Sequence, residues 1–195
     1  MSDAAARVHL RTPRTTIRPA TLADAEATWA YRRLPQVYEW LTFAPVSLEQ
    51  WSALLAEPFR RERTLVVEHD GAVVGDLYLH LQDAWAQAEV LASAARTQAE
   101  IGWAIDPSYG GRGLATEAVD ALVAFCFTDL GLRRVVAQCF ADNEPSWRLM
   151  ERIGMRRESH ALAESLHRSA GWLDSYAYGL LAEEWRARHQ PAGRD

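Results

Sequence analysis

The fold of this chain is decided by residues 99–118, which read AEIGWAIDPSYGGRGLATEA. A pattern typical of an apolar strand runs into Pro107, then into Gly110, Gly111 and Gly113, and then into a helix-forming run. Because glycine has no Cβ, such a loop can turn sharply and bring several backbone N–H groups together. A loop of N–H groups that leads into a helix N-terminus is typical of an anion site, most often one for phosphate. The stretch therefore predicts a strand, a pyrophosphate-binding loop and a helix in succession.

Two common phosphate-binding motifs do not fit this loop. A P-loop requires a Lys-Ser or Lys-Thr pair after its glycines, and the chain contains neither pair. A dinucleotide fingerprint requires a third glycine where Thr116 stands, and an acidic residue at the end of a strand about 20 residues later, which is also missing. For the glycine cluster taken alone, a turn that binds nothing stays an alternative.

The run GGRGLA at residues 110–115 resembles the Gln/Arg-x-x-Gly-x-Gly/Ala motif of the GNAT superfamily of N-acetyltransferases, although Gly110 stands where the family has Gln or Arg. The resemblance implies acetyl-CoA as the cofactor. It also implies that this strand splays from its neighbour, so that free N–H groups hold the pantetheine arm and the thioester carbonyl. The cofactor contacts implied here are Trp103, Ala104, Ile105, Gly110, Gly111, Arg112, Gly113, Leu114, Ala115 and Thr116.

A second motif, NEPSWRLMERIGM, occupies residues 143–155. Pro145 suits the first turn of a helix and Gly154 suits its end. The segment resembles the family's Asn-x-x-Ser helix start, and the resemblance assigns Asn143 to the cofactor arm and Ser146 to the neighbourhood of the CoA sulfur. A plain helix cap is the alternative for Asn143, and a plain helix-start serine is the alternative for Ser146.

Acyl transfer to an amine needs a base, because an amine with a pKa near that of lysine is protonated at neutral pH. Glu100 on the central strand is the candidate base, acting through water, and a salt-bridged structural carboxylate is the alternative. Ser146 is the candidate proton donor to the leaving thiolate. Strand N–H groups near residues 102–104 are the expected oxyanion donors. Direct transfer is expected, because neither Cys126 nor Cys139 has a nucleophile-like context.

The rest of the sequence predicts further strands and helices. Asp70-Gly71 predicts a hairpin turn between two strands, and Thr21 and Ser47 are the expected caps of two early helices. Residues 83–96 are predicted to form a short helix or an ordered loop that borders the acceptor entrance or a subunit contact. The expected strands are residues 15–19, 64–69, 73–81, 98–105, 134–140, 156–162 and 175–181, and the expected helices are residues 22–33, 47–59, 114–130, 143–155 and 183–188.

The opening TTIRPATLADAEATW at residues 15–29 and the GWLD at residues 171–174 resemble the ribosomal-protein N-terminal (RimJ/RimL-like) acetyltransferase branch of GNAT. The resemblance implies one GNAT domain over residues 1–195, α/β (α+β) in class. Its central sheet would be mixed, mostly antiparallel and twisted, with about six to seven strands flanked by helices and splayed at the acyl-CoA site. In this family the early helices wall the acceptor site, whereas plain core packing is the alternative for Trp40 and Phe43.

Length, composition and charge limit the possible classes of protein. The chain has 195 residues, 49% of them hydrophobic, and a formal net charge of −5, so a single domain with a sizeable core is expected and a nucleic-acid partner is not. We expect no secretory signal, no membrane span, no metal site and a cytoplasmic protein. Mobile tails are expected at about residues 1–14 and 190–195. A homodimer is implied by the resemblance alone.

The sequence thus predicts an acetyl-CoA-dependent N-acetyltransferase that transfers directly to a primary amine, with a protein N-terminus as the first choice of acceptor. A small-molecule amine, such as an antibiotic or a polyamine, is the second choice. A CoA-binding module without catalysis is a third hypothesis. The sequence does not identify the acceptor and does not separate an acetyl group from a longer acyl group.

Overall fold

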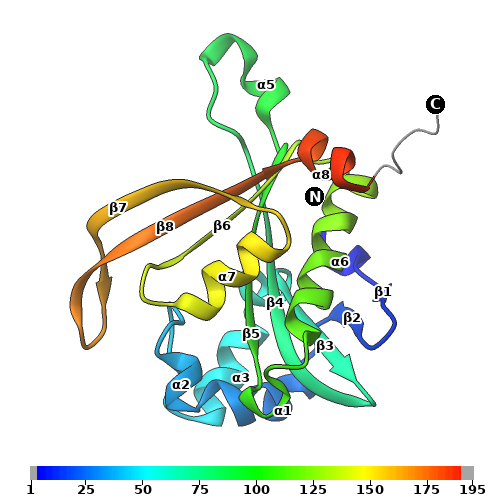
Figure 1. The fold of residues 1–195 in the computed structure, drawn as a ribbon. Helices are drawn as coiled ribbons and strands as arrows, with labels where there is room; N and C mark the ends of the chain where they lie inside the picture. Colours follow the sequence, from blue (N-terminus) through cyan, green and yellow to red (C-terminus); the bar gives the residue numbers. More distant parts are fainter. Residues whose placement is uncertain (1–3, 190–195) are drawn as a thin grey trace.

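A computed structural model of the chain describes residues 4–189. Within this range one mixed sheet has eight strands in the order β1-β2-β3-β4-β5-β6-β8-β7 (Figure 1). Neighbouring strands are antiparallel except β5 and β6, which are parallel. The strands are β1 (Leu10–Arg11), β2 (Thr16–Pro19), β3 (Thr64–His69), β4 (Ala72–Gln82), β5 (Gln98–Ile105), β6 (Arg134–Phe140), β7 (Arg156–His167) and β8 (Gly171–Leu181).

The mixed, mostly antiparallel sheet with flanking helices confirms the predicted fold class. The predicted count of six to seven strands is wrong, because β1 adds a short edge strand that pairs with β2. The helices are α1 (Ala25–Arg32), α2 (Pro35–Tyr38), α3 (Leu48–Ala56), α4 (Pro58–Arg61), α5 (Leu91–Ala94), α6 (Leu114–Thr128), α7 (Glu144–Arg152) and α8 (Ala182–His189), with 3-10 turns η1 (Ala5–Arg7), η2 (Leu22–Asp24), η3 (Ala88–Val90) and η4 (Pro107–Tyr109).

Local signals explain several of these elements. Asp70 and Gly71 have φ values of 49° and 78°, so both adopt the left-handed conformation that a two-residue hairpin turn between β3 and β4 requires. Ser47 caps α3 as predicted, since its side chain accepts a hydrogen bond from the Gln50 N–H at 3.1 Å. The Gln50 side chain in turn accepts from the Val46 N–H at 2.8 Å. These contacts need only neighbouring residues, which is why the sequence predicts them.

Helices pack on both faces of the sheet. This is clear along β3, whose side chains point alternately into two different hydrophobic clusters. Leu65 and Val67 belong to the main core, which also contains the buried face of α6. Val66 points the opposite way and joins a second cluster with Trp51 and Leu55 of α3. All three β3 side chains are fully buried, which is the expected pattern for a strand that is covered on both faces.

The N-terminal segment does not form the expected tail. Val8 is fully buried, Ala5 is 2% exposed, and both pack in the main core, while Leu10 and Arg11 pair with β2. The prediction of a mobile tail is therefore wrong for residues 4–14, because three small or apolar side chains of this segment find a place in the core. The tail predicted for residues 190–195 lies outside the described residues.

Residues 83–97 form an arm that projects from one end of the sheet, whereas α1, α2 and α3 gather at the other end (Figure 1). The arm contains η3 and α5, and its Trp85 is 94% exposed. The predicted helix in this region is thus only one short turn. Within residues 4–189, no helix is long and apolar enough to cross a bilayer.

The β7–β8 hairpin is longer than predicted and reaches the α2 end of the molecule. His167, near its tip, is 6% exposed, and its Nε2 hydrogen-bonds with the carbonyl oxygen of Glu39 at 2.9 Å. The ring also lies 5.5 Å from that of Trp40, centroid to centroid. The hairpin tip therefore holds the segment that follows α2, which lines the cavity described next.

Candidate active site

The parallel strands β5 and β6 separate halfway along their length. They pair only at Gln98, Ala99 and Glu100, opposite Arg134, Val135 and Val136. Beyond Glu100, residues 101–105 keep their pairing with β4 on one side but have no partner on the β6 side. The structure thus has the splayed strand that the sequence resemblance implied. Backbone groups of β5 that face the gap are free to bind a ligand.

A cavity of about 620 Å³ occupies this gap. Its volume lies in the range typical of small-molecule sites, roughly 300–1,000 Å³. One end is bounded by β6 and the start of α7, and the other end by α1, α2, α4 and the segment after α2. Its lining includes Glu100, Trp103, Ala104, Ile105, Ala115, Cys139, Asn143 and Ser146 toward the first end, and Arg32, Trp40, Phe43, Phe59, Arg60, Asp76 and Tyr78 toward the second.

The glycine loop lies between β5 and α6 and presents backbone N–H groups. Gly111 and Gly113 have φ values of 71° and 77°, which a residue with a Cβ rarely adopts. Glu117 makes the first hydrogen bond of α6, to the Gly113 carbonyl at 3.0 Å. Within residues 4–189, the N–H groups from Gly111 to Thr116 therefore donate to no other protein group. This row of free donors at a helix N-terminus fits a pyrophosphate.

Gly110 behaves differently from the other predicted loop residues. Its N–H is already bonded to the Pro107 carbonyl at 3.0 Å, inside the η4 turn. A Cβ at this position would lie 3.0 Å from that same carbonyl oxygen. Gly110 thus shapes the turn that leads into the loop, and its amide is not among the free donors.

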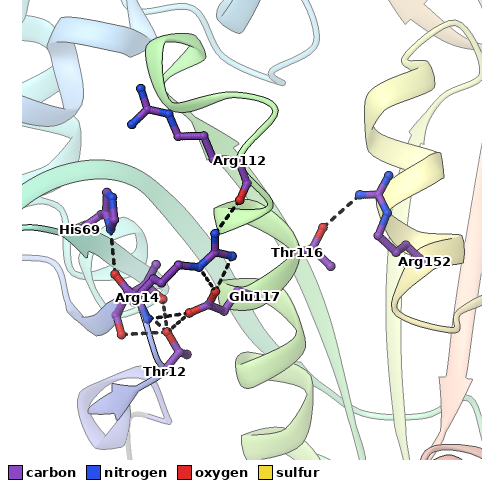
Figure 2. Close-up of polar contacts among 8 residues, drawn as sticks. Thr12, Arg14, His69, Arg112, Thr116, Glu117 and Arg152 are labelled. Carbon is purple, nitrogen blue, oxygen red and sulfur yellow. Dashed lines mark hydrogen bonds and ion pairs between the residues drawn. The ribbon is translucent and has the colours of Figure 1, made fainter.

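Arg14, in the N-terminal segment, hydrogen-bonds to the glycine loop and to the start of α6 (Figure 2). These contacts were not predicted from the sequence. Arg14 Nη1 donates to the Arg112 carbonyl at 2.7 Å, and its Nε donates to Glu117 Oε2 at 2.6 Å. Thr12 Oγ1 also donates to Glu117, at 2.5 Å. Burial alone would raise the pKa of Glu117, but the hydrogen bonds from Thr12 and Arg14 hold it below its usual value. The start of α6 is therefore anchored to the N-terminal segment.

On the opposite side, Arg152 at the end of α7 donates to Thr116 Oγ1 at 3.0 Å (Figure 2). The guanidinium of Arg112 is exposed and lies 5.3 Å from the Tyr109 ring centroid. The free amides are thus flanked by three guanidiniums, from Arg14, Arg112 and Arg152. Only Arg112 was predicted, because the other two come from distant parts of the chain. Guanidinium groups match phosphate oxygens well.

Glu100 lies at the point where β5 and β6 part, and its side chain borders the cavity. Gln82 Nε2 donates to its Oε2 at 2.7 Å, so one oxygen is held by an amide. No cation forms an ion pair with Glu100 among the described residues, which removes the salt-bridged alternative. Within residues 4–189, the Glu100 carboxylate therefore lines the cavity with an amide, and not a cation, as its side-chain partner.

Asn143 and Ser146 come from the start of α7 and line the same cavity. The Asn143 side chain makes no capping hydrogen bond, so the plain helix cap is not its role here. The Ser146 hydroxyl hydrogen-bonds with the Cys139 thiol. Burial raises the pKa of Cys139 to about 11, although the bond with Ser146 acts in the other direction. The thiol therefore stays protonated at neutral pH, as expected for a residue that is not a nucleophile.

The second end of the cavity contains a buried ion pair that sequence reasoning also missed. Asp76 on β4 accepts from Tyr31 Oη at 2.6 Å and from Arg32 Nε at 2.9 Å through one oxygen, and from Arg32 Nη2 at 2.5 Å through the other. Burial raises the pKa of Tyr31 well above its usual value. Burial alone would lower the pKa of Arg32, but Asp76 raises it. The only signal in the sequence was a carboxylate between apolar residues of β4.

Trp40 and Phe43 line the second end of the cavity and are absent from the main core, which favours the cavity wall over the core alternative. None of residues 83–97 lines this cavity, so the predicted role of the arm at the acceptor entrance or at a subunit contact stays a prediction. Within residues 4–189, no group of three or more His, Cys, Asp or Glu side chains is placed to hold a metal ion. The unpaired edge of β5 thus lies between the row of free loop amides, which suits a phosphate-type anion, and the carboxylate of Glu100.

Comparison with known proteins agrees with this geometry. The Acetyltransferase (GNAT) domain family model matches residues 14–156. "Uncharacterized N-acetyltransferase YnaD" of Bacillus subtilis is 41% identical over 86 residues, which are 44% of this chain and 50% of that protein, so this match spans half of the relative. "Putative ribosomal N-acetyltransferase YdaF" of Bacillus subtilis is 29% identical over 180 residues, 87% of this chain and 92% of that protein.

Solved structures show the same fold. A GNAT-family acetyltransferase from Bacillus anthracis superposes with a TM-score of 0.77 at 28% identity, over 90% of this chain and 99% of that one. RimJ of Mycobacterium smegmatis, solved in complex with CoA-disulfide, has a TM-score of 0.70 at 28% identity, over 87% of this chain and 83% of that one. The family match covers the glycine loop, Glu100 and the start of α7. The chain therefore belongs to the GNAT family of acetyltransferases.

Proposed function

We propose that this acetyltransferase moves an acetyl group from acetyl-CoA directly to the amine of a protein N-terminus. The observation that carries the proposal is the single cavity that connects the open edge of β5, the start of α7 and the carboxylate of Glu100. The name of YdaF and the RimJ structure support a ribosomal-protein type of acceptor. The cavity volume of about 620 Å³ favours a small-molecule amine as the second candidate acceptor.

Acetyl-CoA supplies an acetyl group that is activated as a thioester. The amides from Gly111 to Thr116 bind the pyrophosphate, and the β5 N–H groups that face the gap stabilise negative charge on the thioester oxygen, an effect typically worth about 3 kcal/mol per donor. Asn143 binds the pantetheine arm. Glu100 would remove the amine proton through a water molecule while the amine nitrogen bonds to the acetyl carbon. As the C–S bond breaks, the Ser146 hydroxyl would pass a proton to the leaving sulfur and take one up from solvent.

The cofactor half of the proposal is tested by Gly113→Val and by Gly131→Val as its matched control. Both glycines have positive φ, 77° and 64°, and they lie at opposite ends of α6, so the backbone strain is similar. Only the Gly113 variant places a side chain beside the free amides and near Arg14. We expect CoA binding, measured by calorimetry, to be lost in Gly113→Val and kept in Gly131→Val. CoA affinity that survives in Gly113→Val would contradict the assignment of the loop.

The catalytic half is tested by Glu100→Gln, with Glu89→Gln on the exposed arm as control. Release of free thiol is followed with acetyl-CoA and a panel of peptides and small amines. Loss of a general base typically lowers turnover by roughly 10²–10⁴-fold, with CoA affinity nearly unchanged. An unchanged rate and an unchanged pH profile would remove Glu100 from the mechanism. Turnover with small amines but with no peptide would favour the second acceptor class.

A further inference from the structure

Arg60 places a positive charge without a partner at the acceptor end of the cavity. It lies on α4, directly after Pro58 and Phe59, and its backbone carbonyl accepts from Thr64 Oγ1 at 2.8 Å, which ties this turn to the start of β3. Its side chain is partly buried and lines the cavity. Across residues 4–189, nothing accepts a hydrogen bond from its guanidinium or forms an ion pair with it.

The nearest buried carboxylate is not available to Arg60. Asp76 uses both oxygens for Tyr31 and Arg32, so its charge is already balanced within that cluster. Burial and the neighbouring Arg32 charge lower the pKa of Arg60, which shows that its surroundings do not favour the cation. A guanidinium is nevertheless charged at any physiological pH. Asp76 and Glu57 offset the lowering of the Arg60 pKa in part through space, but within residues 4–189 no carboxylate pairs directly with the Arg60 guanidinium.

The cavity also carries a separate negative group, Glu100. Tyr78 lies between the two charges, because it sits on the same face of β4 as Asp76 and pairs with Gly102, two residues beyond Glu100 on β5. Burial raises the pKa of Tyr78 and Glu100 adds to this effect, whereas Arg63 and then Arg60 oppose it, so the charges of Glu100 and Arg60 both act on this phenol. Arg60 and Glu100 do not form an ion pair with each other. Both side chains line the same cavity.

We propose that Arg60 is a specificity-determining residue that binds a carboxylate on the acceptor. The inference rests on the proposed acetyl transfer and narrows its acceptor to amines that also carry a carboxylate. The amine faces Glu100 and the carboxylate faces the planar fork of Arg60, which suits bidentate binding. The aromatic rings of Trp40, Phe43 and Phe59 line the same end of the cavity and contact the apolar part of the acceptor.

The carboxylate can come from the α-carboxyl group of a free amino acid or from an acidic second residue of a peptide. The experiment uses two acceptor pairs, each differing only in that charge. The first pair is L-phenylalanine and L-phenylalaninamide. The second is a pair of C-terminally amidated tetrapeptides that begin Ala-Asp and Ala-Asn. Steady-state kinetics at saturating acetyl-CoA are measured for the wild type, Arg60→Gln, Arg60→Lys and the exposed neighbour variant Arg61→Gln.

We expect the wild type to prefer the charged member of at least one pair, and the pair identifies the source of the carboxylate. Arg60→Gln is expected to raise the KM of that acceptor by roughly 10–100-fold with little change in kcat, while its neutral partner changes by less than about 3-fold. Arg60→Lys is expected to retain part of the preference, because it keeps the charge without the fork. Arg61→Gln should match the wild type. An equal loss on both members, or a wild-type preference for both neutral members, would overturn the inference.

A binding measurement separates failure of the proposed acetyl transfer from failure of the Arg60 carboxylate site. If the wild type acetylates none of the four acceptors, binding of L-phenylalanine to the CoA-loaded protein is measured by calorimetry. Binding that weakens at least about 10-fold in Arg60→Gln, but not in Arg61→Gln, upholds the carboxylate site without catalysis. Absence of binding to the wild type overturns it. Unfolding curves of each variant show whether a loss reflects the site or the fold.

Discussion

Replacing Asp76 by Asn tests the buried ion pair that shapes the acceptor end of the cavity. The side chains of Asp76 and Arg32 are only 4% and 10% exposed, and the carboxylate accepts three hydrogen bonds. Asn has nearly the same shape as Asp but carries no charge. Its side-chain NH2 group would also face a hydrogen-bond donor of Arg32 or Tyr31 where Asp76 has an acceptor oxygen. Removing one partner of a buried pair typically costs about 3–5 kcal/mol, since the remaining charge is left uncompensated. For a chain of this size, that corresponds to a fall in Tm of roughly 6–20 °C.

The loss is measured by thermal and urea unfolding. Asp70→Asn is the matched control, because Asp70 is 89% exposed in a turn that Asn also tolerates, and it should change stability by less than about 0.5 kcal/mol. The double variant Arg32→Met with Asp76→Leu should lose less stability than Asp76→Asn, because no buried charge is left unpaired. A loss below about 1 kcal/mol in Asp76→Asn would refute the buried, charged pair.

Three further predictions concern the loop, the thiols and Ser146. Because the pKa of Glu117 is depressed in the folded state, its contribution to stability is present above the unfolded-state pKa of about 4.3 and is lost as the pH falls through the folded-state value. Glu117→Gln should therefore lower Tm more at pH 7 than at pH 3, whereas the exposed Glu49→Gln should lower it at neither pH. Burial raises the pKa of Cys126 to about 12 and that of Cys139 to about 11, so both thiols should react slowly with Ellman's reagent at pH 8 and rapidly in urea. Cys139→Ala should keep most of the turnover, and an inactive but folded variant would instead assign a covalent role to this thiol. Ser146→Ala should lower kcat by roughly 10²-fold without changing the Kd of CoA, and a rate equal to that of the exposed control Ser93→Ala would remove the proton donor.

The sequence alone was enough for those parts of the molecule that depend on a few consecutive residues. Gly111 and Gly113 adopt the positive φ values that make the loop a row of free amides, and Asp70-Gly71 adopts the hairpin turn. The strand, loop and helix of residues 99–118 follow in the predicted order. Backbone conformation at such positions is set by local sterics, and glycine is the residue that permits it. Glu100 was predicted from its place on the central strand, and Asn143 and Ser146 were predicted from the family resemblance; the structure places all three on the lining of one cavity.

Only the tertiary structure brought together the charges around the site. Arg14 and Glu117 are 103 residues apart, and Tyr31 and Asp76 are 45 residues apart. No local pattern marks such partners, because an arginine or a carboxylate is equally at home on a solvated surface. The burial of Ala4, Ala5 and Val8 likewise depends on a core that the rest of the chain builds. The conformation of the glycine loop was therefore determined by its consecutive residues, whereas the pairing of charges at the Asp76 end of the cavity came from packing between distant elements.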